Sequence, residues 1–263
     1  MKFCLNVEEL FQDMEIYDKI KAAHDAGYDY IEFWSWCDRD VERIKAECEK
    51  YGVQITGFKG DWDWSLVDSA TRDEFIGWTK KSIETAKYLN CDSIIVHSNS
   101  IFEEGAADFN GVYTPERQIA NITATLMKAA PILEAGGVKM YIEPLNCINH
   151  LAGMFLADVE VTADIIRAVG SPNIRLLCDI FQNQRRHGDV TAHMLKNLDI
   201  MDYVHVADSP DRGEPGTGEL NYKFILKTLK ENGFDGVAAL ELTPIGTDAE
   251  VIAAYDEVVA AVK

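Results

Sequence analysis

Short apolar runs alternate with longer amphipathic stretches along the chain. The runs are rich in β-branched and aromatic residues, which is typical of buried strands. Eight such runs occupy residues 3–6, 28–34, 54–60, 93–98, 138–145, 174–180, 201–208 and 236–242. In the stretches between them, apolar positions fall three and four residues apart, as in a helix packed against a sheet. Such stretches occupy residues 40–51, 71–90, 115–135, 158–169, 221–232 and 248–263.

This alternation of strands and helices limits the fold. Strands joined through helices lie parallel, and eight of them in about 250 residues is the number at which a parallel sheet closes into a barrel. Glycines that suit left-handed helix ends follow the helical stretches at Gly27, Gly52, Gly136, Gly137, Gly170 and Gly233. An open doubly wound sheet is the alternative, but no GxGxxG motif follows the first strand. We predict one α/β domain, a single (β/α)8 TIM barrel, over residues 1–263.

Four polar side chains stand at the ends of the last four predicted strands, where the active site of a closed barrel is built. They are Glu143, Asp179, His205 and Glu241. Taken one at a time, such a carboxylate can cap a helix or form an ion pair, and a histidine can be a core residue. Together in one cavity, three carboxylates repel one another unless a cation neutralises them. We therefore expect these four residues to hold one divalent metal ion.

The donor set also indicates which metal and which chemistry to expect. Three oxygen ligands and one nitrogen suit Mn2+, with Mg2+ or Co2+ as alternatives, better than a structural zinc. A metal that binds the two adjacent oxygens of a hydroxy-carbonyl compound acidifies the neighbouring C–H and stabilises an enediolate. Glu143 and Glu241 would then remove and return the proton. Return to the other carbon isomerises the substrate, and return to the opposite face of the same carbon epimerises it.

The net charge of the chain limits the classes of partner that we expect it to bind. Asp and Glu number 44 against 25 Lys and Arg, and a net charge of -19 repels nucleic acid and anionic membranes. No apolar run approaches the roughly 18 residues of a membrane span, and the N-terminus lacks a signal-peptide core. The six cysteines form no CxxC pair and are expected to be reduced and structural. We expect a cytoplasmic enzyme whose partner is a small carbohydrate or hydroxy-keto acid.

Residues 205–222, HVADSPDRGEPGTGELNY, closely resemble the seventh-strand segment of hydroxypyruvate isomerases. Three more segments are similar to the same family: Ile142-Glu143-Pro144-Leu145-Asn146, Cys178-Asp179-Ile180-Phe181 and Gly60-Asp61-Trp62. The resemblance implies the xylose-isomerase-like barrel that this family shares with ketose 3-epimerases. It implies that Glu143, Asp179, His205 and Glu241 bind the metal and that the two glutamates form the acid/base pair. It also allows a homo-oligomer, since relatives are often dimers or tetramers.

The sequence departs from this family at the substrate pocket. Gln182 stands where the family has a substrate-binding histidine, and Asn149 stands where it has a second-sphere carboxylate. Histidine at position 205, where hydroxypyruvate isomerases tend to have glutamine, favours sugars. Arg212 matches a position that contacts substrate oxygens, although a solvated loop arginine is the simpler interpretation.

Further polar and aromatic residues gather at the ends of strands two to four. His97 ends strand four, where the multi-zinc apurinic endonucleases of the superfamily have a metal ligand, but Gln182 replaces another histidine that those sites need. Trp62 lies near Lys59 and three more tryptophans, Trp34, Trp36 and Trp64. These rings are expected either to stack on a sugar or aglycone or simply to pack under a lid. We include His97, Asn149, Gln182, Arg212 and Trp62 among the predicted substrate-binding residues.

Three functions remain open at this point. The leading hypothesis is a divalent-metal-dependent isomerase or epimerase that acts through an enediolate on hydroxypyruvate, a ketose or a sugar derivative. A metal-dependent lyase that cleaves 3-oxo-glycosides, as in related C-glycoside deglycosidases, is the first alternative. A non-catalytic sugar-binding barrel or subunit is the second.

Overall fold

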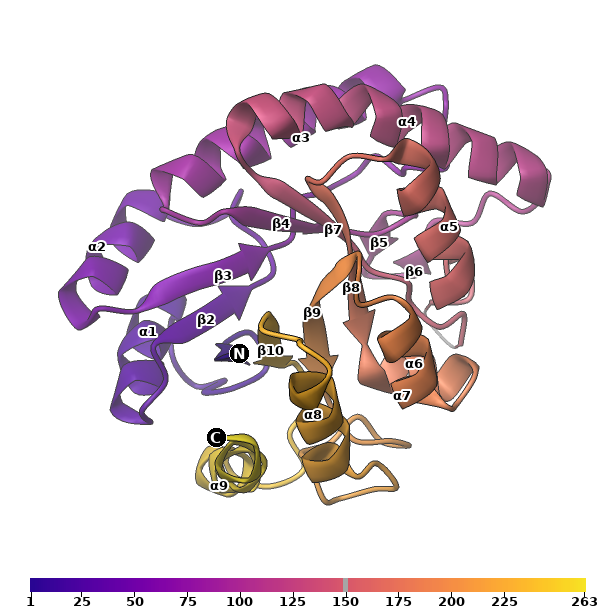
Figure 1. The fold of residues 1–263 in the computed structure, drawn as a ribbon. Helices are drawn as coiled ribbons and strands as arrows, with labels where there is room; N and C mark the ends of the chain where they lie inside the picture. Colours follow the sequence, from indigo (N-terminus) through magenta and orange to yellow (C-terminus); the bar gives the residue numbers. More distant parts are fainter. Residues whose placement is uncertain (149–150) are drawn as a thin grey trace.

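The computed structural model describes residues 1–148 and 151–263, which form parallel strands surrounded by helices (Figure 1). The strands are β1 (Lys2–Asn6), β2 (Tyr30–Phe33), β3 (Gln54–Phe58), β4 (Ser93–Val96), β5 (Ile101–Phe102), β6 (Gly105–Ala106), β7 (Lys139–Ile142), β8 (Ile174–Asp179), β9 (Met201–Val206) and β10 (Val237–Leu240). The helices are α1 (Ile16–Asp25), α2 (Val41–Tyr51), α3 (Arg72–Tyr88), α4 (Pro115–Gly136), α5 (Val159–Val169), α6 (Ile180–Arg186), α7 (Val190–Lys196), α8 (Tyr222–Glu231) and α9 (Asp248–Val262).

Eight of the strands form one parallel sheet that nearly closes on itself. Their order is β3-β2-β1-β10-β9-β8-β7-β4, so β3 and β4 are its two edges. These edges meet at a parallel bridge between Lys59 and Ile95, next to which the Gly60 amide donates to the Ile95 carbonyl over 2.7 Å. A Cβ at Gly60 would lie 2.7 Å from the Cβ of Ile94, so only glycine allows this approach. The barrel prediction is confirmed, and the open doubly wound alternative is wrong.

All eight predicted strands are present, and the six predicted helical stretches correspond to α2, α3, α4, α5, α8 and α9. The sequence prediction gave no range for α1, although it expected a helix to end at Gly27, and it missed α6, α7 and the antiparallel hairpin of β5 and β6. Helices α6 and α7 have seven residues each, which is too short for an apolar period to stand out. Helix α1 turns a buried lysine toward the barrel, where Lys19 donates to the carbonyls of Val7 and Glu8 over 2.7 and 2.9 Å.

Local sequence signals set where the helices begin and end. Helix α9 begins with a capping box, in which the Thr247 side chain accepts from the Glu250 amide and the Glu250 carboxylate accepts from Thr247. Helices α2, α4 and α5 end at Gly52, Gly137 and Gly170, each of which adopts the left-handed conformation. The prediction that glycines end these helices is therefore confirmed.

The barrel interior holds a small apolar layer beneath the site. This layer consists of Cys4, Ile95, Tyr141, Leu177, Tyr203, Val237 and Ala239. Six polar residues each lie two positions after a member of the layer: Asn6, His97, Glu143, Asp179, His205 and Glu241. Since alternate residues of a strand face the same side, these six side chains also point into the barrel, one layer nearer its carboxyl end. The alternation of the strands thus builds the site on an apolar floor.

Two further sequence expectations concern cysteines and membranes. All six cysteines are free, and Cys4, Cys48, Cys91 and Cys178 are buried. Burial raises the pKa of the Cys48 and Cys91 thiols to about 12, so these groups remain protonated at neutral pH. Within the described ranges, no helix combines the length and the apolar character that a membrane crossing requires.

Candidate metal and active site

Glu143, Asp179, His205 and Glu241 meet at the carboxyl ends of four neighbouring strands, β7 to β10. All four are buried, and one ligand atom from each lies within 4.8 Å of the others. The strand register explains this convergence, because Asp179 pairs with His205 across β8 and β9. The amides of Glu143 and Glu241 each continue the ladder one residue past a strand end, donating to Val96 over 3.1 Å and to Val206 over 3.2 Å.

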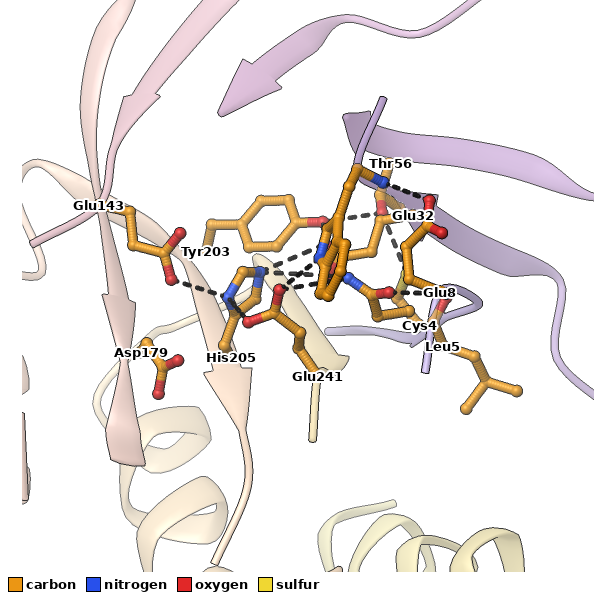
Figure 2. Close-up of polar contacts among 12 residues, drawn as sticks. Cys4, Leu5, Glu8, Glu32, Thr56, Glu143, Asp179, Tyr203, His205 and Glu241 are labelled. Carbon is orange, nitrogen blue, oxygen red and sulfur yellow. Dashed lines mark hydrogen bonds and ion pairs between the residues drawn. The ribbon is translucent and has the colours of Figure 1, made fainter. Parts of the chain in front are cut away.

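His205 lies between three carboxylates, those of Glu143, Glu241 and Glu32 (Figure 2). Its Nδ1 is 3.0 Å from Oε1 of Glu143 and 3.1 Å from Oε2 of Glu241. Its Nε2 points the other way and is 3.2 Å from Oε1 of Glu32. The two glutamates predicted to be the acid/base pair therefore flank the same ring nitrogen, while Glu32 takes the other.

Glu32 is a site residue that the sequence prediction missed. It lies at 1% exposure on β2 and accepts from Nδ2 of Asn6 over 2.9 Å and from the hydroxyl of Tyr203. The hydroxyl of Tyr203 also contacts Oγ1 of Thr56 at 2.9 Å (Figure 2). A signal was present, because Glu32 interrupts an apolar strand in the same way as the four predicted ligands.

Arg212 reaches into the site from the loop after β9. Its Nη2 donates to Oδ2 of Asp179 over 3.1 Å and to Oε2 of Glu241. The backbone of Arg212 is held in a left-handed conformation with φ 62°, and its carbonyl accepts from the Thr243 amide over 2.9 Å. The structure thus places Arg212 in the candidate site, in contact with two predicted metal ligands, and the simpler interpretation of a solvated loop arginine is not supported.

His97 approaches from β4 and holds the other oxygen of Glu143. Its Nε2 is 3.1 Å from Oε2 of Glu143, and its Nδ1 is 3.1 Å from Oδ2 of Asp61. The same Asp61 oxygen accepts from the His97 amide over 2.9 Å. Both oxygens of Glu143 therefore contact imidazoles, which fixes the orientation of this carboxylate.

Burial and close charges shift the pKa values of these groups in opposite directions. Burial alone would lower the pKa of His205, but Glu32, Glu241 and Glu143 together raise it well above its ordinary value. Burial would raise the pKa of Glu241, but Arg212 and His205 hold it well below the usual range. Burial and the nearby Glu143 raise the pKa of Asp179 to about 6, although Arg212 opposes them. The site thus separates carboxyl groups of very different acidity within a few ångströms.

A cavity of about 380 Å³ opens above these groups. One part of its lining is polar and includes Glu143, His205 and Glu241. Another part is apolar and includes Trp62 and Leu151. The predicted substrate residues His97, Gln182, Arg212 and Trp62 all line it. Asn149, the fifth, lies outside the described residues.

The tryptophans near the cavity differ in what their rings contact. Trp36, Trp62 and Trp64 gather around Trp78, with ring centroids 5.0, 6.0 and 5.7 Å from it. Trp34 instead donates from its indole nitrogen to Oε1 of Glu241 over 2.9 Å. Packing accounts for Trp36 and Trp64, whereas Trp34 and Trp62 line the cavity.

A family model described as a xylose isomerase-like TIM barrel matches residues 20–257. The chain belongs to this family. It is 27% identical over 251 residues to hydroxypyruvate isomerase of Escherichia coli (strain K12), an alignment that covers 93% of this chain and 94% of the relative. The match confirms the resemblance seen in the sequence.

Solved structures confirm the fold of the family. An AP endonuclease, family 2, from Brucella melitensis has a TM-score of 0.88 at 24% identity, over 97% of this chain and 98% of its own. D-Psicose 3-epimerase with D-tagatose from Clostridium cellulolyticum H10 has a TM-score of 0.85 at 17% identity, over 100% of both chains. At these identities the likeness shows a shared barrel and carries no statement about activity.

Gln182 shows how this member of the family fills the position where a histidine was expected. The backbone N–H of Gln182 donates to Oδ1 of Asp179 over 3.1 Å, at the start of α6. Its side-chain oxygen accepts from the Asn146 amide over 3.0 Å and from the Asn146 side chain. The glutamine oxygen is thus occupied by Asn146, and it helps to fix the loop that follows Glu143.

The donor chemistry of the four buried residues fits a divalent metal ion. Glu143, Asp179 and Glu241 offer three carboxylates and His205 offers one imidazole, all on rigid strand ends. Oxygen-rich sites of this kind suit Mn2+ or Mg2+, and a single histidine is compatible with either. The contact between Nε2 of His205 and Glu32 is the carboxylate–histidine pairing that commonly orients a metal-binding ring.

Proposed function

We propose that this protein is a divalent-metal-dependent isomerase or epimerase that acts on small hydroxy-carbonyl substrates through an enediolate. The observation that carries the proposal is that Glu143 and Glu241 flank Nδ1 of His205 at 3.0 and 3.1 Å, within a buried group of four potential metal ligands. The name of its relative, hydroxypyruvate isomerase of Escherichia coli, supports the same class of reaction.

In this proposal Glu143, Asp179, His205 and Glu241 hold the ion, with Mn2+ as the expected metal and Mg2+ or Co2+ as alternatives. When bound, the ion supplies Lewis acidity, which lowers the pKa of the C–H beside the substrate carbonyl. The buried position shields these groups from much of the solvent, and this strengthens the electrostatic interactions within the site.

The protein groups then move the proton. Oε2 of Glu143 is held by His97 at 3.1 Å, and Oε1 of Glu241 is held by the Trp34 indole at 2.9 Å. These contacts keep each carboxylate at a fixed angle to the cavity, as efficient general acid–base catalysis requires. One glutamate removes the proton from the carbon beside the carbonyl, and the other returns a proton to the intermediate. The site of return distinguishes isomerisation from epimerisation.

A deuterium experiment tests the reaction class directly. The Mn2+-loaded protein is incubated in heavy water with hydroxypyruvate, ketoses and oxo-sugars, and carbon-bound deuterium is followed by NMR. We expect deuterium to enter a carbon beside the carbonyl, and its position identifies isomerisation or 3-epimerisation. The absence of exchange in every compound, with metal bound, would overturn the proposal.

Replacing either glutamate separates catalysis from binding. We expect Glu143→Gln and Glu241→Gln each to lower kcat by about 10²–10⁴-fold, because each removes a positioned proton-transfer group. The shape and volume of the side chain are kept, so calorimetry should show a folded protein. Glu231→Gln is the matched control, since this carboxylate is 64% exposed on α8. A wild-type protein that binds a sugar but shows no turnover to lose would instead indicate a non-catalytic sugar-binding barrel.

The apolar part of the cavity favours one second candidate. Trp62, Ile101, Leu145 and Leu151 line it and present a surface on which an aglycone could rest. In a 3-oxo-glycoside, Glu143 or Glu241 would then remove the proton from the carbon between the 3-oxo group and the anomeric carbon, and the bond to the aglycone would break. The other glutamate would give the aglycone a proton, while a bound metal would supply Lewis acidity at the oxo group. Release of aglycone from a 3-oxo-glucoside by the purified chain, alone or with a partner subunit, tests this candidate, and no release removes it.

A further inference from the structure

A lysine and an arginine, Lys59 and Arg212, line the cavity. Nη2 of Arg212 already donates to both Asp179 and Glu241, although its Nε has no acceptor among the described residues. The ammonium of Lys59 is in a different situation. In residues 1–148 and 151–263, its nearest acidic oxygen is Oδ1 of Asp61 at 4.0 Å, and none of these residues accepts a hydrogen bond from it.

The strand pattern turns Lys59 toward the cavity. Phe58 stacks on Phe33 in the outer core, with ring centroids 5.6 Å apart, so the residues on either side of Phe58 face the opposite way. A Cβ at Gly57 would lie 3.4 Å from Ile95 Cδ1, which is in the interior apolar layer. Lys59 shares this inner face with Gly57, and its side chain is only 19% exposed.

The contact between Lys59 and Asp61 leaves the ammonium with free donors. The Oδ2 atom of Asp61 is taken by the ring and the amide of His97, and its Oδ1 lies 4.0 Å from the ammonium, beyond hydrogen-bond distance. The ammonium has three donors, and none of the described residues accepts a hydrogen bond from it, so water or a ligand in the cavity must supply the acceptors. An anionic oxygen in the cavity would supply one of them.

Barrel topology places Lys59 opposite the candidate metal ligands. In the sheet order, β3 lies four strands from β9 in either direction, once the β3 and β4 edges are joined. The four ligands are on β7 to β10, in the half of the barrel centred near β9. A substrate held by its hydroxy-carbonyl end at these ligands therefore extends toward Lys59.

We propose that Lys59 is an anion anchor and that the substrate carries a carboxylate or phosphate at the end away from Glu143 and Glu241. The proposal rests on the proposed function for the orientation of the substrate, but the binding of an anion at Lys59 is independent of turnover. It defines the substrate class as an acidic hydroxy-carbonyl compound in preference to a neutral ketose. A charge-assisted hydrogen bond from Lys59, in a cavity partly shielded from solvent, raises the affinity for the anion and discriminates against a neutral substrate.

Three hydroxy-carbonyl probes of similar size test this anchor by calorimetric titration of the metal-loaded protein. Hydroxypyruvate carries a carboxylate, dihydroxyacetone phosphate carries a phosphate, and dihydroxyacetone is neutral. We expect Lys59→Met to weaken the binding of at least one anionic probe by about 10- to 100-fold, in line with one lost hydrogen bond to a charged group. Dihydroxyacetone should bind the variant and the wild type equally. Which anionic probe loses affinity identifies carboxylate or phosphate as the recognised group.

Lys128→Met is the matched control, because this lysine is half exposed on α4 and, among the described residues, pairs only with Asp73. It should change none of the three affinities. Equal affinity of wild type and Lys59→Met for both anions would overturn the anchor, and so would an equal loss for the neutral probe. If anion binding depends on Lys59 while no probe or sugar exchanges deuterium, the anchor stands and the proposed reaction fails.

Discussion

At the scale of single residues, the orientation of His205 decides what the site can bind. Nε2 of its ring faces Glu32, which also accepts from Asn6 and Tyr203, so Glu32 cannot turn away without breaking three contacts. In the neutral ring, donation of Nε2–H to Glu32 leaves the lone pair of Nδ1 on the side of Glu143 and Glu241, where a metal ion would take the place of the second proton. Glu32 therefore selects the tautomer that a metal ion requires, although it is not itself one of the four ligands.

We predict that Glu32→Gln lowers the affinity for Mn2+ by about 10- to 100-fold, as is common when the carboxylate partner of a metal-binding histidine is altered. The amide can donate to Nε2, which favours the wrong tautomer. Competition with a chelator measures the affinity, and ¹⁵N NMR of the His205 ring reports the tautomer without any need for turnover. Unchanged affinity together with an unchanged ring tautomer would contradict this role. Glu231→Gln again provides the exposed control.

The sequence could show the ligands but could not show what orients them. Glu143, Asp179, His205 and Glu241 each interrupt or end an apolar run, and a barrel brings strand ends together, so their convergence was predictable. Two of the three partners of Glu32, Tyr203 and His205, are 171 and 173 residues away from it. No local pattern encodes a contact across that separation, and only the closed sheet creates it.

At the scale of elements, the loop after β9 is a folded unit built around Asp208. Its carboxylate accepts from the amides of Gly216, Gly218 and Leu220 over 2.8, 3.0 and 2.9 Å. The same loop carries Arg212 into the site. Gly218 packs so closely that a Cβ there would lie 1.9 Å from the Ser209 carbonyl oxygen. The position of Arg212 therefore depends on a glycine six residues away.

We predict that Gly218→Ala lowers kcat/KM by at least about tenfold, because the loop must shift and Arg212 leaves its two carboxylates. The barrel itself should remain folded, since the change lies outside its strands. Steady-state kinetics measures the loss, and calorimetry checks that unfolding remains a single transition. Gly111→Ala is the control, because no neighbouring atom lies within 4 Å of a Cβ built there. A variant with wild-type kinetics would show that Arg212 does not need this loop geometry.

Across the whole barrel, the two ends of the sheet carry different groups of charged residues. The carboxyl end holds the candidate site, and the amino end holds an ion cluster in which Asp202 accepts from Lys139 over 2.7 Å and from Arg175 over 3.3 Å. These residues connect β7, β8 and β9 at their beginnings.

The barrel was predictable because strand and helix periods repeat along the chain. The hairpin of β5 and β6 was not, since two-residue strands carry no period.

The amino-end cluster gives a pH-dependent prediction. Burial would raise the pKa of Asp202, but Lys139 and Arg175 hold it below its ordinary value. A carboxyl group of lowered pKa contributes stability above its unfolded-state pKa, and this contribution is lost as the pH falls through its folded-state pKa. We predict that Asp202→Asn lowers the free energy of unfolding by about 1–2 kcal/mol at pH 7 and by less at acid pH.

Urea unfolding at several pH values measures this difference. Asp25→Asn is the control, since this residue is 54% exposed and its one ion pair within residues 1–148 and 151–263 is with Lys21. A cost that stays constant as the pH falls through the acid range would contradict the role assigned to the charge of Asp202.

All five tryptophans lie between residues 34 and 78, from the end of β2 into α3. Three of them gather around Trp78, and Trp34 touches Glu241. The intrinsic fluorescence of the protein is therefore a local signal from one sector of the barrel, and it includes one fluorophore bonded to the candidate site. Tryptophan emission excited at 295 nm will therefore report the unfolding of that sector. The half of the barrel that carries β7 to β10 contains no tryptophan and contributes no emission of its own.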